Sequence, residues 1–367
     1  MQPLDLIALL AGIFLILRAI LSAIRTFVLP RAANDGIARI VFRSVRRVFD
    51  LAASPIDEYK RRDSLMAYFG PLALVVLPVV WLAMVGAGYT LIFWAIGIRP
   101  LGQAVTDSGA SLLTLGFAHP ETPAGDVIAF SEAVIGLGMV ALLIAYLPTI
   151  YAAFSRRELL VRLLETRAES PPSPIVLVTR LYRLQGLDQL HGLWERWEQW
   201  FAELEETHTS LTVLVHFRSQ RPELSWVNAA GAILDAGALV RSSVAIPIDA
   251  QADLMIRAGC IALRRITGAF HLPFDPSPTA ETPTRIDRAT FDAALDVLAS
   301  SGVPLTADRE AAWRDFHAWR VYYDEALQRL ERLTVAPPPW WILPMRSAPA
   351  TDKPLEPAPQ PTGGPVA

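Results

Sequence analysis

The stretch from Leu101 to Ala118 contains the residues whose types and spacing can do chemistry. It reads LGQAVTDSGASLLTLGFA and is mostly apolar after Ser108, although it only has to connect two long apolar runs. We expect a helix over about 102–113 and then an irregular turn, so that the segment re-enters the membrane. Non-helical backbone is tolerated at that depth only where it is buried in protein or lines a watery path. A span, a re-entrant helix, a short Gly-containing strand and a second span form the layout of an ion-conducting pore.

The end of this segment carries a resemblance to a known family. Thr114-Leu115-Gly116-Phe117-Ala118 resembles the Thr-Val-Gly-Tyr-Gly filter of potassium channels, and residues 108–113 resemble the pore helix before it. Residues 132–158 resemble the inner helix of bacterial channels in the two-span pore-loop superfamily. The resemblance covers about residues 64–158. It implies an all-α membrane protein with a pore-loop channel domain. It does not reach the C-terminal 200 residues, where the residue pattern predicts a helical cytoplasmic domain.

The chemistry of such a filter depends on backbone oxygens. A potassium ion exchanges its water shell for rings of carbonyl oxygens, which the resemblance assigns to residues 114–118, and Thr114 can add its hydroxyl. Leu115 and Phe117 would pack outward and anchor the strand, and Gly116 would permit the left-handed backbone that turns a carbonyl toward the axis. One strand supplies one quarter of the cage, so the resemblance implies a homotetramer with fourfold symmetry.

Three residues depart from the family pattern. Ala118 replaces the second glycine, and a left-handed alanine costs roughly 1–2 kcal/mol. His119, at the outer mouth, replaces the usual aspartate, so an acidic ring is lost there. Leu113 replaces a threonine. Because these changes bear on selectivity, a non-selective cation pore is an alternative to a potassium pore.

An acidic residue lies inside the span that follows the filter. Glu132 is about two turns into this span, counted from Asp126. A carboxylate there is costly unless it meets water or a partner. Two interpretations are open, a brace behind the filter and a side chain that reaches the outer interface, and we favour the brace.

The same span contains candidates for a hinge and a gate. Glycines lie in its middle, and a proline near its cytoplasmic end removes one helical hydrogen bond and can bend the helix. Aromatic side chains beside this proline can form a constriction, although such residues also serve as interfacial anchors. The candidates are Gly136, Gly138, Tyr146, Pro148, Tyr151 and Phe154.

Three apolar runs predict membrane spans. Residues 64–98 carry no charge and, at about 1.5 Å per residue, exceed a hydrocarbon core of roughly 30 Å. Residues 127–154 carry only Glu132, whereas residues 6–29 are interrupted by Arg18 and Arg25. The chain does not begin with the basic residues of a signal peptide. We therefore expect residues 1–30 to form an uncleaved anchor helix. The other two runs predict a two-helix pore domain over residues 64–158, with a re-entrant loop at 101–120.

The basic residues predict the orientation of these spans. Eight of them lie between Pro30 and Asp63, three more (Arg156, Arg157 and Arg162) follow the last span, and only Arg99 lies in the connection 99–125. The positive-inside rule then places the C-terminus in the cytoplasm. We therefore expect a multi-pass protein of the cell's inner membrane.

The first cytoplasmic loop, residues 31–63, has its own pattern. Its apolar and basic residues alternate at helical spacing, which predicts an amphipathic helix along the inner membrane surface with its arginines toward anionic lipid. A helix packed on the C-terminal unit is the alternative. The apolar side has Ile37, Ile40, Val41, Val45 and Val48, and the basic side has Arg39, Arg43, Arg46 and Arg47.

Charged residues become frequent after the last span. Residues 159–335 predict a helical cytoplasmic domain, because apolar stripes recur at helical spacing, with breaks at 170–174 and 271–284. Helices are expected at 187–206, 226–243, 250–268, 288–300 and 307–333. Residues 336–367 contain ten prolines and predict a disordered tail, in which the apolar residues 340–343 can touch the bilayer or the domain.

Composition excludes several classes of protein. With 52% hydrophobic and 19% charged residues, the chain is too apolar for an ordinary soluble enzyme, and a net charge of −3 gives no attraction to nucleic acid. The single cysteine, Cys260, excludes multi-cysteine zinc sites, and no nucleotide-binding or catalytic motif is present. We expect no enzyme and no cofactor. Expected partners are potassium or other monovalent cations and the lipid bilayer, and the alternative function is a non-conducting membrane scaffold whose cytoplasmic domain binds a partner.

Overall fold

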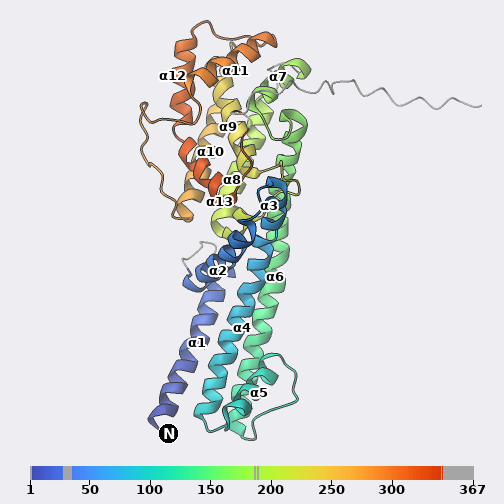
Figure 1. The fold of residues 1–367 in the computed structure, drawn as a ribbon, viewed down its shortest axis with the longest axis vertical. Coiled ribbons are helices and arrows are strands. Elements are labelled where there is room, and N and C mark those ends of the chain that lie inside the picture. The colour runs from blue at the N-terminus through green and yellow to red at the C-terminus, as the bar shows by residue number, and fades with distance from the viewer. Residues whose placement is uncertain (1, 28–34, 186, 188–189, 340, 342–367) are drawn as a thin grey trace, which may run out of the picture.

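The fold has two parts, an apolar bundle of long helices and a domain of shorter ones (Figure 1). The computed structural model describes residues 2–27, 35–185, 187, 190–339 and 341. Across these residues the structure is helical and contains no strand, only an isolated bridge between Val244 and Leu305. The expectation of an all-α chain is therefore confirmed for the described residues.

The apolar bundle consists of α1 (Pro3–Phe27), α4 (Phe69–Ala95), α5 (Leu101–Leu112) and α6 (Pro123–Ala168). The three long helices run side by side, and the short α5 packs against α4 and α6 at one end of the bundle (Figure 1). By length and composition these three helices can cross a membrane, which is compatible with a membrane protein.

Close backbone contact joins α1 to α4. A Cβ atom at Gly12 would lie 2.5 Å from the Gly88 carbonyl oxygen, and one at Gly88 would lie 2.8 Å from the Gly12 oxygen. Nearer the other end of α1, the Trp81 indole donates to Ser22 over 2.8 Å, and Ser22 donates to Asp35 over 2.5 Å. Small residues permit close approach and buried hydrogen bonds then fix the register.

Two helices lie between the bundle and the second part of the fold (Figure 1): α2 (Gly36–Ala53) and α3 (Tyr59–Met66). Asp35 begins α2 as its N-cap, because its carboxylate accepts the Ala38 N–H. Phe42, Val45 and Phe49 of α2 pack on Phe69 and Ala73 of α4. The amphipathic pattern in residues 31–63 thus forms a helix, while residues 28–34 lie outside the described chain.

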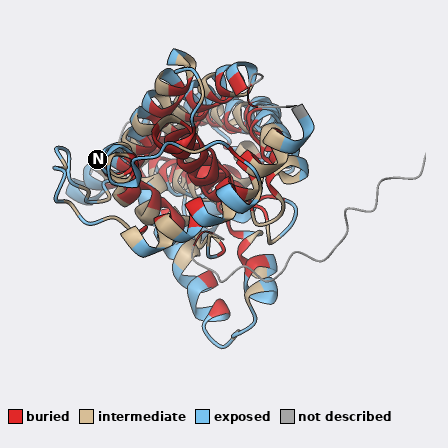
Figure 2. Cartoon of the chain, turned by 90° about the horizontal axis from the view of Figure 1, so that it is seen from above, coloured by how far each residue is buried: buried red, intermediate tan, exposed pale blue. Residues whose placement is uncertain are grey.

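The second part, called the C-terminal domain here, packs around α9, nearly all of whose residues are buried. Seen along the long axis of the molecule, buried residues gather toward the centre of the fold (Figure 2). The elements of this domain are α7 (Pro174–Gln185), α8 (Leu190–Ser210), the 3₁₀ helix η2 (Thr212–His216), α9 (Trp226–Ser243), α10 (Ala250–Ala269), α11 (Arg288–Ser300), α12 (Arg309–Arg320) and α13 (Asp324–Thr334).

Helices predicted at 226–243 and 288–300 are confirmed, and those at 187–206 and 250–268 are confirmed with shifted ends. The single helix expected at 307–333 is wrong, since the chain turns at 321–323 between α12 and α13. No glycine or proline marks this turn in the sequence. Helix α6 continues past residue 158, the predicted end of the pore domain, and ends at Ala168.

The start of the proline-rich tail packs on the C-terminal domain. Pro337 is buried, and its carbonyl accepts a hydrogen bond from the Asn228 amide over 2.8 Å. Trp341 is buried against the ring of Phe316, with 5.9 Å between ring centroids. Of the residues expected to touch either the bilayer or the domain, Trp341 thus contacts the domain. The expectation of disorder for residues 342–367 lies outside the described chain.

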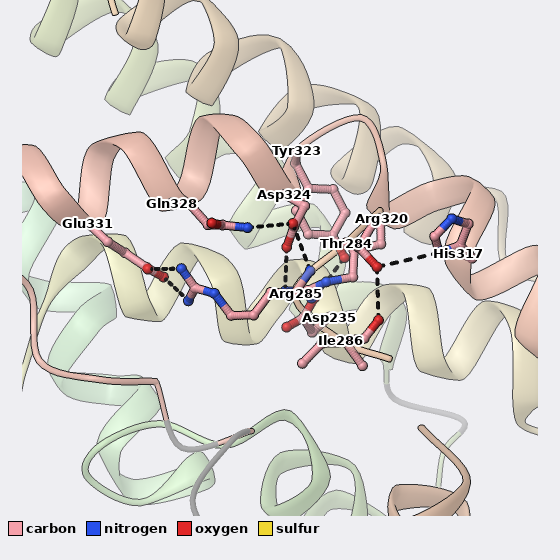
Figure 3. A network of polar contacts seen from close by, with 10 residues as sticks. All are labelled: Asp235, Thr284, Arg285, Ile286, His317, Arg320, Tyr323, Asp324, Gln328 and Glu331. Carbon is pink, nitrogen blue, oxygen red and sulfur yellow. Dashed lines mark hydrogen bonds and ion pairs between the residues drawn. The ribbon is translucent and has the colours of Figure 1, made fainter. Parts of the chain in front are cut away.

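A buried ion-pair network lies at the turn between α12 and α13 (Figure 3). Arg320, only 1% exposed, pairs with Asp235 of α9 and, over 2.9 Å, with Asp324 of α13. The Tyr323 hydroxyl donates to Asp235 over 2.8 Å, and the Arg285 N–H donates to Asp324 over 3.0 Å. Arg320 and Tyr323 thus reach the same carboxylate, Arg320 from the last residue of α12 and Tyr323 from the turn that follows.

Arg320→Met is expected to lower the melting temperature of the full-length protein by roughly 10 °C, because removing one partner leaves buried charges uncompensated. The control is Arg314→Met on the same helix, which is exposed and should shift the melting temperature by only about 2 °C. Thermal unfolding of the detergent-solubilised protein measures both. Equal melting temperatures for wild type and Arg320→Met would contradict this role of the network.

Candidate ion-conducting segment

The connection between α4 and α5 is fixed at one end of the bundle. The Arg99 guanidinium lies over the Trp94 ring, 3.7 Å from its centroid, and pairs with Asp5 of α1 over 3.0 Å. The beginning of α1, the end of α4 and the beginning of α5 therefore meet at the same level.

From this level α5 runs into the bundle. Its last residue, Leu112, contacts Gly86 of α4 and Gly136 of α6. Gly86 lies about two and a half turns before the end of α4, and Gly136 about three and a half turns after the start of α6. At 1.5 Å per residue, the end of α5 is roughly 14–20 Å inside the bundle. The chain then returns to Thr122, the N-cap of α6.

Two neighbouring contacts hold α5 against α6. The Ser108 hydroxyl lies 2.6 Å from Oε1 of Glu132, which is fully buried, and 3.0 Å from the Gly86 carbonyl oxygen. One turn further along both helices, Leu112 covers Gly136, where a Cβ atom would overlap the Leu112 carbonyl oxygen. The structure thus places Glu132 against α5 and away from the end of the bundle, and it gives Gly136 a packing role at a site expected to be a hinge.

The backbone after α5 is left-handed at two positions, of which only Gly116 was expected. Gly116 has φ +71°, and Thr114 has φ +54°. The Thr114 N–H donates to the Ser111 carbonyl over 3.0 Å, and the Leu115 N–H donates to the Ala110 carbonyl over 2.8 Å, so the segment is tied to the last turn of α5. Ala118 does not have a positive φ, and the cost expected for a left-handed alanine does not arise.

The side chains of this segment have few partners in their own chain. Leu115 is 60% exposed and Phe117 70% exposed, so the packing expected to anchor the strand is not made within one chain. His119 is exposed, and its Nδ1 lies 3.0 Å from the Pro120 carbonyl oxygen. Leu113 is exposed as well.

One face of α6 is apolar and exposed along most of the bundle. The exposed residues follow alternating spacings of three and four, which is the seven-residue repeat of helices that pack on one another. Among the hinge and gate candidates, Pro148 and Tyr151 belong to this repeat and Gly138 lies beside it. We call these residues the α6 seam: Val127, Phe130, Val134, Leu137, Ala141, Ile144, Pro148 and Tyr151.

The remaining gate candidates point elsewhere. Tyr146 is buried against the ring of Phe27, with 4.2 Å between centroids, and Phe154 packs on Phe217, with 5.9 Å between centroids. The structure therefore does not bring the four residues suggested for a constriction onto one face. It places two of them on the α6 seam and two against the rest of the chain.

At the far end of the bundle, α6 is joined to the C-terminal domain by a buried arginine. Arg157 is 4% exposed and donates to the carbonyls of Leu214 over 2.9 Å and Phe217 over 2.6 Å. It also pairs with Glu158 over 2.8 Å, and its own carbonyl accepts the Trp200 indole N–H over 3.1 Å. Apolar residues of η2, among them Val213 and Leu214, pack on α4 and α6 beside it.

Two buried histidines line this junction. Burial and the neighbouring Arg157 hold the pKa of His208 well below its usual value. Burial, Arg46 and Arg218 lower the pKa of His216 to about 3. Both side chains are thus neutral at physiological pH. They do not form a metal site, since the described chain contains no group of three or more side chains that could hold a metal ion.

Sequence reasoning did not identify Ser108 as the partner of Glu132, nor Asp107, a 1%-exposed carboxylate that accepts a hydrogen bond from Gln103 over 2.8 Å. Asp107 is the one acidic residue between Leu101 and Ala118, which was a usable signal. Arg157 was noted only as part of the basic end of the span. Nothing in the sequence distinguishes it from Arg156 beside it.

Comparisons with protein-family models, with curated proteins and with solved structures find no match for this chain. The function is therefore inferred from the geometry of residues 113–122 and from the contacts of α5 with α4 and α6.

Gly136→Ala is expected to displace α5, because the new methyl group would overlap the Leu112 carbonyl oxygen. Gly138→Ala is the matched control on the same helix, since a Cβ atom there meets nothing within 4 Å. We expect a lower melting temperature and faster proteolysis within residues 113–122 for Gly136→Ala only. The same behaviour in both variants would show that Gly136 is not a contact between α5 and α6.

Acidification below about pH 6.5 is expected to destabilise the junction at His216. Because the pKa of His216 is lower in the folded chain than in the unfolded one, the unfolded state binds the proton more tightly and stability falls as the pH falls. His216→Phe should remove roughly 2 kcal/mol of this loss between pH 6.5 and 5. Unfolding at both pH values measures it, and equal stability of the two proteins at pH 8 controls for packing. An unchanged pH dependence in the variant would contradict this explanation.

Proposed function

We propose that this chain forms a homotetrameric cation channel that conducts potassium passively through a pore lined by residues 114–118. The observation that carries the proposal is the depth of α5. A loop between two apolar helices that reaches roughly half of a 30 Å hydrocarbon core has no use as a plain connection.

The end of α5 is suited to cations. The last carbonyls of a helix carry partial negative charge, and α5 ends deep in the bundle rather than at its surface. The left-handed backbone at Thr114 and Gly116 breaks the helical hydrogen-bond pattern directly after this end, so carbonyl oxygens there are left to bind other groups. Ion binding by main-chain oxygens needs no acidic side chain in the segment.

Assembly is supported by the surfaces that one chain leaves uncovered. The α6 seam continues for more than three heptads. Leu115 and Phe117, which precede the seam in the sequence, are exposed as well. Symmetric copies that pack these residues on one another would supply the packing that Leu115 and Phe117 lack in a single chain. Because one chain contributes one copy of residues 114–118, four copies complete the ring of oxygens.

The proposed orientation places residues 101–122 outside the cell and the C-terminal domain in the cytoplasm. It rests on the basic residues between Pro30 and Asp63 and after the last span. We place the channel in the cell's inner membrane.

Reconstituted protein in liposomes is expected to release potassium down a gradient, with a native mass of four chains. Gly116→Ala should abolish flux and leave the tetramer intact, because alanine resists the φ of +71° found there. Gly102→Ala is the control, since a methyl group at that exposed helical position meets nothing within 4 Å and the φ is ordinary.

The outcomes separate the alternatives. Equal potassium and sodium flux would indicate a non-selective pore, and absence of flux from an intact assembly would favour a non-conducting scaffold. Undiminished flux in Gly116→Ala would show that residues 114–118 are not the filter. A monomer or dimer as the sole species would contradict the pore itself.

A further inference from the structure

Helix α2 has three distinct sides. One side is buried, where Val41, Phe42, Val45 and Phe49 pack on the apolar bundle. A second side reaches the C-terminal domain through Arg46, which donates to the Leu333 carbonyl over 3.3 Å and pairs with Asp50 over 2.9 Å. The third side is exposed. Contacts on two sides fix the rotation of α2 and hence which residues occupy the third.

Three arginines at intervals of four residues lie on the exposed side. Arg39, Arg43 and Arg47 are exposed, and within the described chain none of them forms an ion pair or a side-chain hydrogen bond. The one acidic residue within α2, Asp50, is already paired with Arg46. Positive charge on this row is therefore uncompensated by neighbouring side chains of its own helix.

Apolar side chains lie next to this row. Ile40 and Val48 are each 64% exposed and Leu51 is 74% exposed. At 100° per residue they follow the arginines around the helix and precede the buried face. A soluble surface gains nothing from such a stripe, whereas an interfacial helix buries it just below the headgroups.

The neighbouring surface is also apolar. On α1, exposed Leu17, Leu21 and Ile24 lead toward the end of the helix that faces α2 (Figure 1). Helix α1 thus carries exposed apolar residues up to the end that lies next to α2.

We propose that α2 binds the headgroups of anionic phospholipids through Arg39, Arg43 and Arg47, while Ile40, Val48 and Leu51 lie among the upper acyl carbons. The proposal rests on the membrane placement given above and not on ion conduction. Because Arg46 holds the same helix against the end of α13, the bound lipid and the C-terminal domain both contact α2.

The test is native mass spectrometry of the full-length protein in detergent with phosphatidylglycerol or phosphatidylcholine. Wild type should retain phosphatidylglycerol in preference. The triple variant Arg39→Gln, Arg43→Gln, Arg47→Gln should lose about tenfold or more in phosphatidylglycerol affinity, since each arginine near an anionic surface contributes severalfold. Its melting temperature should stay at the wild-type value, because these side chains make no bond within the described chain.

The matched control is Arg196→Gln, Arg257→Gln, Arg314→Gln, which removes the same charge from exposed helices of the C-terminal domain. It should retain wild-type lipid binding. Equal loss in both triple variants would reduce the effect to net charge and overturn the proposal. So would full retention of phosphatidylglycerol in the α2 variant.

A second variant separates a lipid from a free phosphate group. Ile40→Ser, Val48→Ser, Leu51→Ser should weaken phosphatidylglycerol retention severalfold and leave the arginines in place. Inorganic phosphate that competes fully with the lipid, together with wild-type retention in this variant, would show a phosphate site and contradict the lipid proposal. Ion flux enters none of these measurements, so failure here is distinguishable from failure of the channel.

Discussion

The contact between the second half of α5 and α6 is the constraint on which the candidate segment depends. The residues after α5 donate their N–H groups to carbonyls in the last turn of α5, so their position follows that of α5. Ser108 against Glu132 and Leu112 against Gly136 hold it there, one turn apart on both helices. A larger residue at 136 or an apolar one at 132 would change the depth of α5, and the position of Thr114 and Gly116 follows from that depth.

The same helix that supports α5 also enters the C-terminal domain. Helix α6 is continuous from Pro123 to Ala168, although Pro148 lies inside it. At its far part, Arg157 is enclosed by carbonyls and by the neutral ring of His208, 3.2 Å away. A guanidinium so buried tolerates little relative movement, because each lost hydrogen bond would leave a charged donor unpaired. The bundle and the C-terminal domain are thus joined by the buried hydrogen bonds of Arg157, which lie inside an apolar cluster.

Some of this arrangement could be predicted from sequence and some could not. The long apolar runs predicted the three long helices, and the helical spacing around 226–243 predicted α9, because periodicity reports directly on burial. The turn between α12 and α13 was missed because no glycine or proline marks it, and because Asp235, the partner of Arg320 and Tyr323 there, is far away in sequence. In the candidate segment, Gly116 was singled out for its backbone freedom, and the structure has the left-handed φ there. Thr114 could not be recognised in that way, since threonine rarely takes such a φ. The partner of Glu132 was equally hidden, because only the fold brings residues 108 and 132 together.

The central claim is that α5 directs residues 114–118 toward an axis shared by four chains. A cryo-electron microscopy map of the full-length protein in lipid nanodiscs tests it most directly. The account predicts fourfold symmetry, with the carbonyl end of α5 toward the axis, Leu115 and Phe117 covered by protein, and the α6 seam between symmetry-related helices. A particle in which α5 faces lipid, or in which the chains share no rotational axis through residues 114–118, would contradict it.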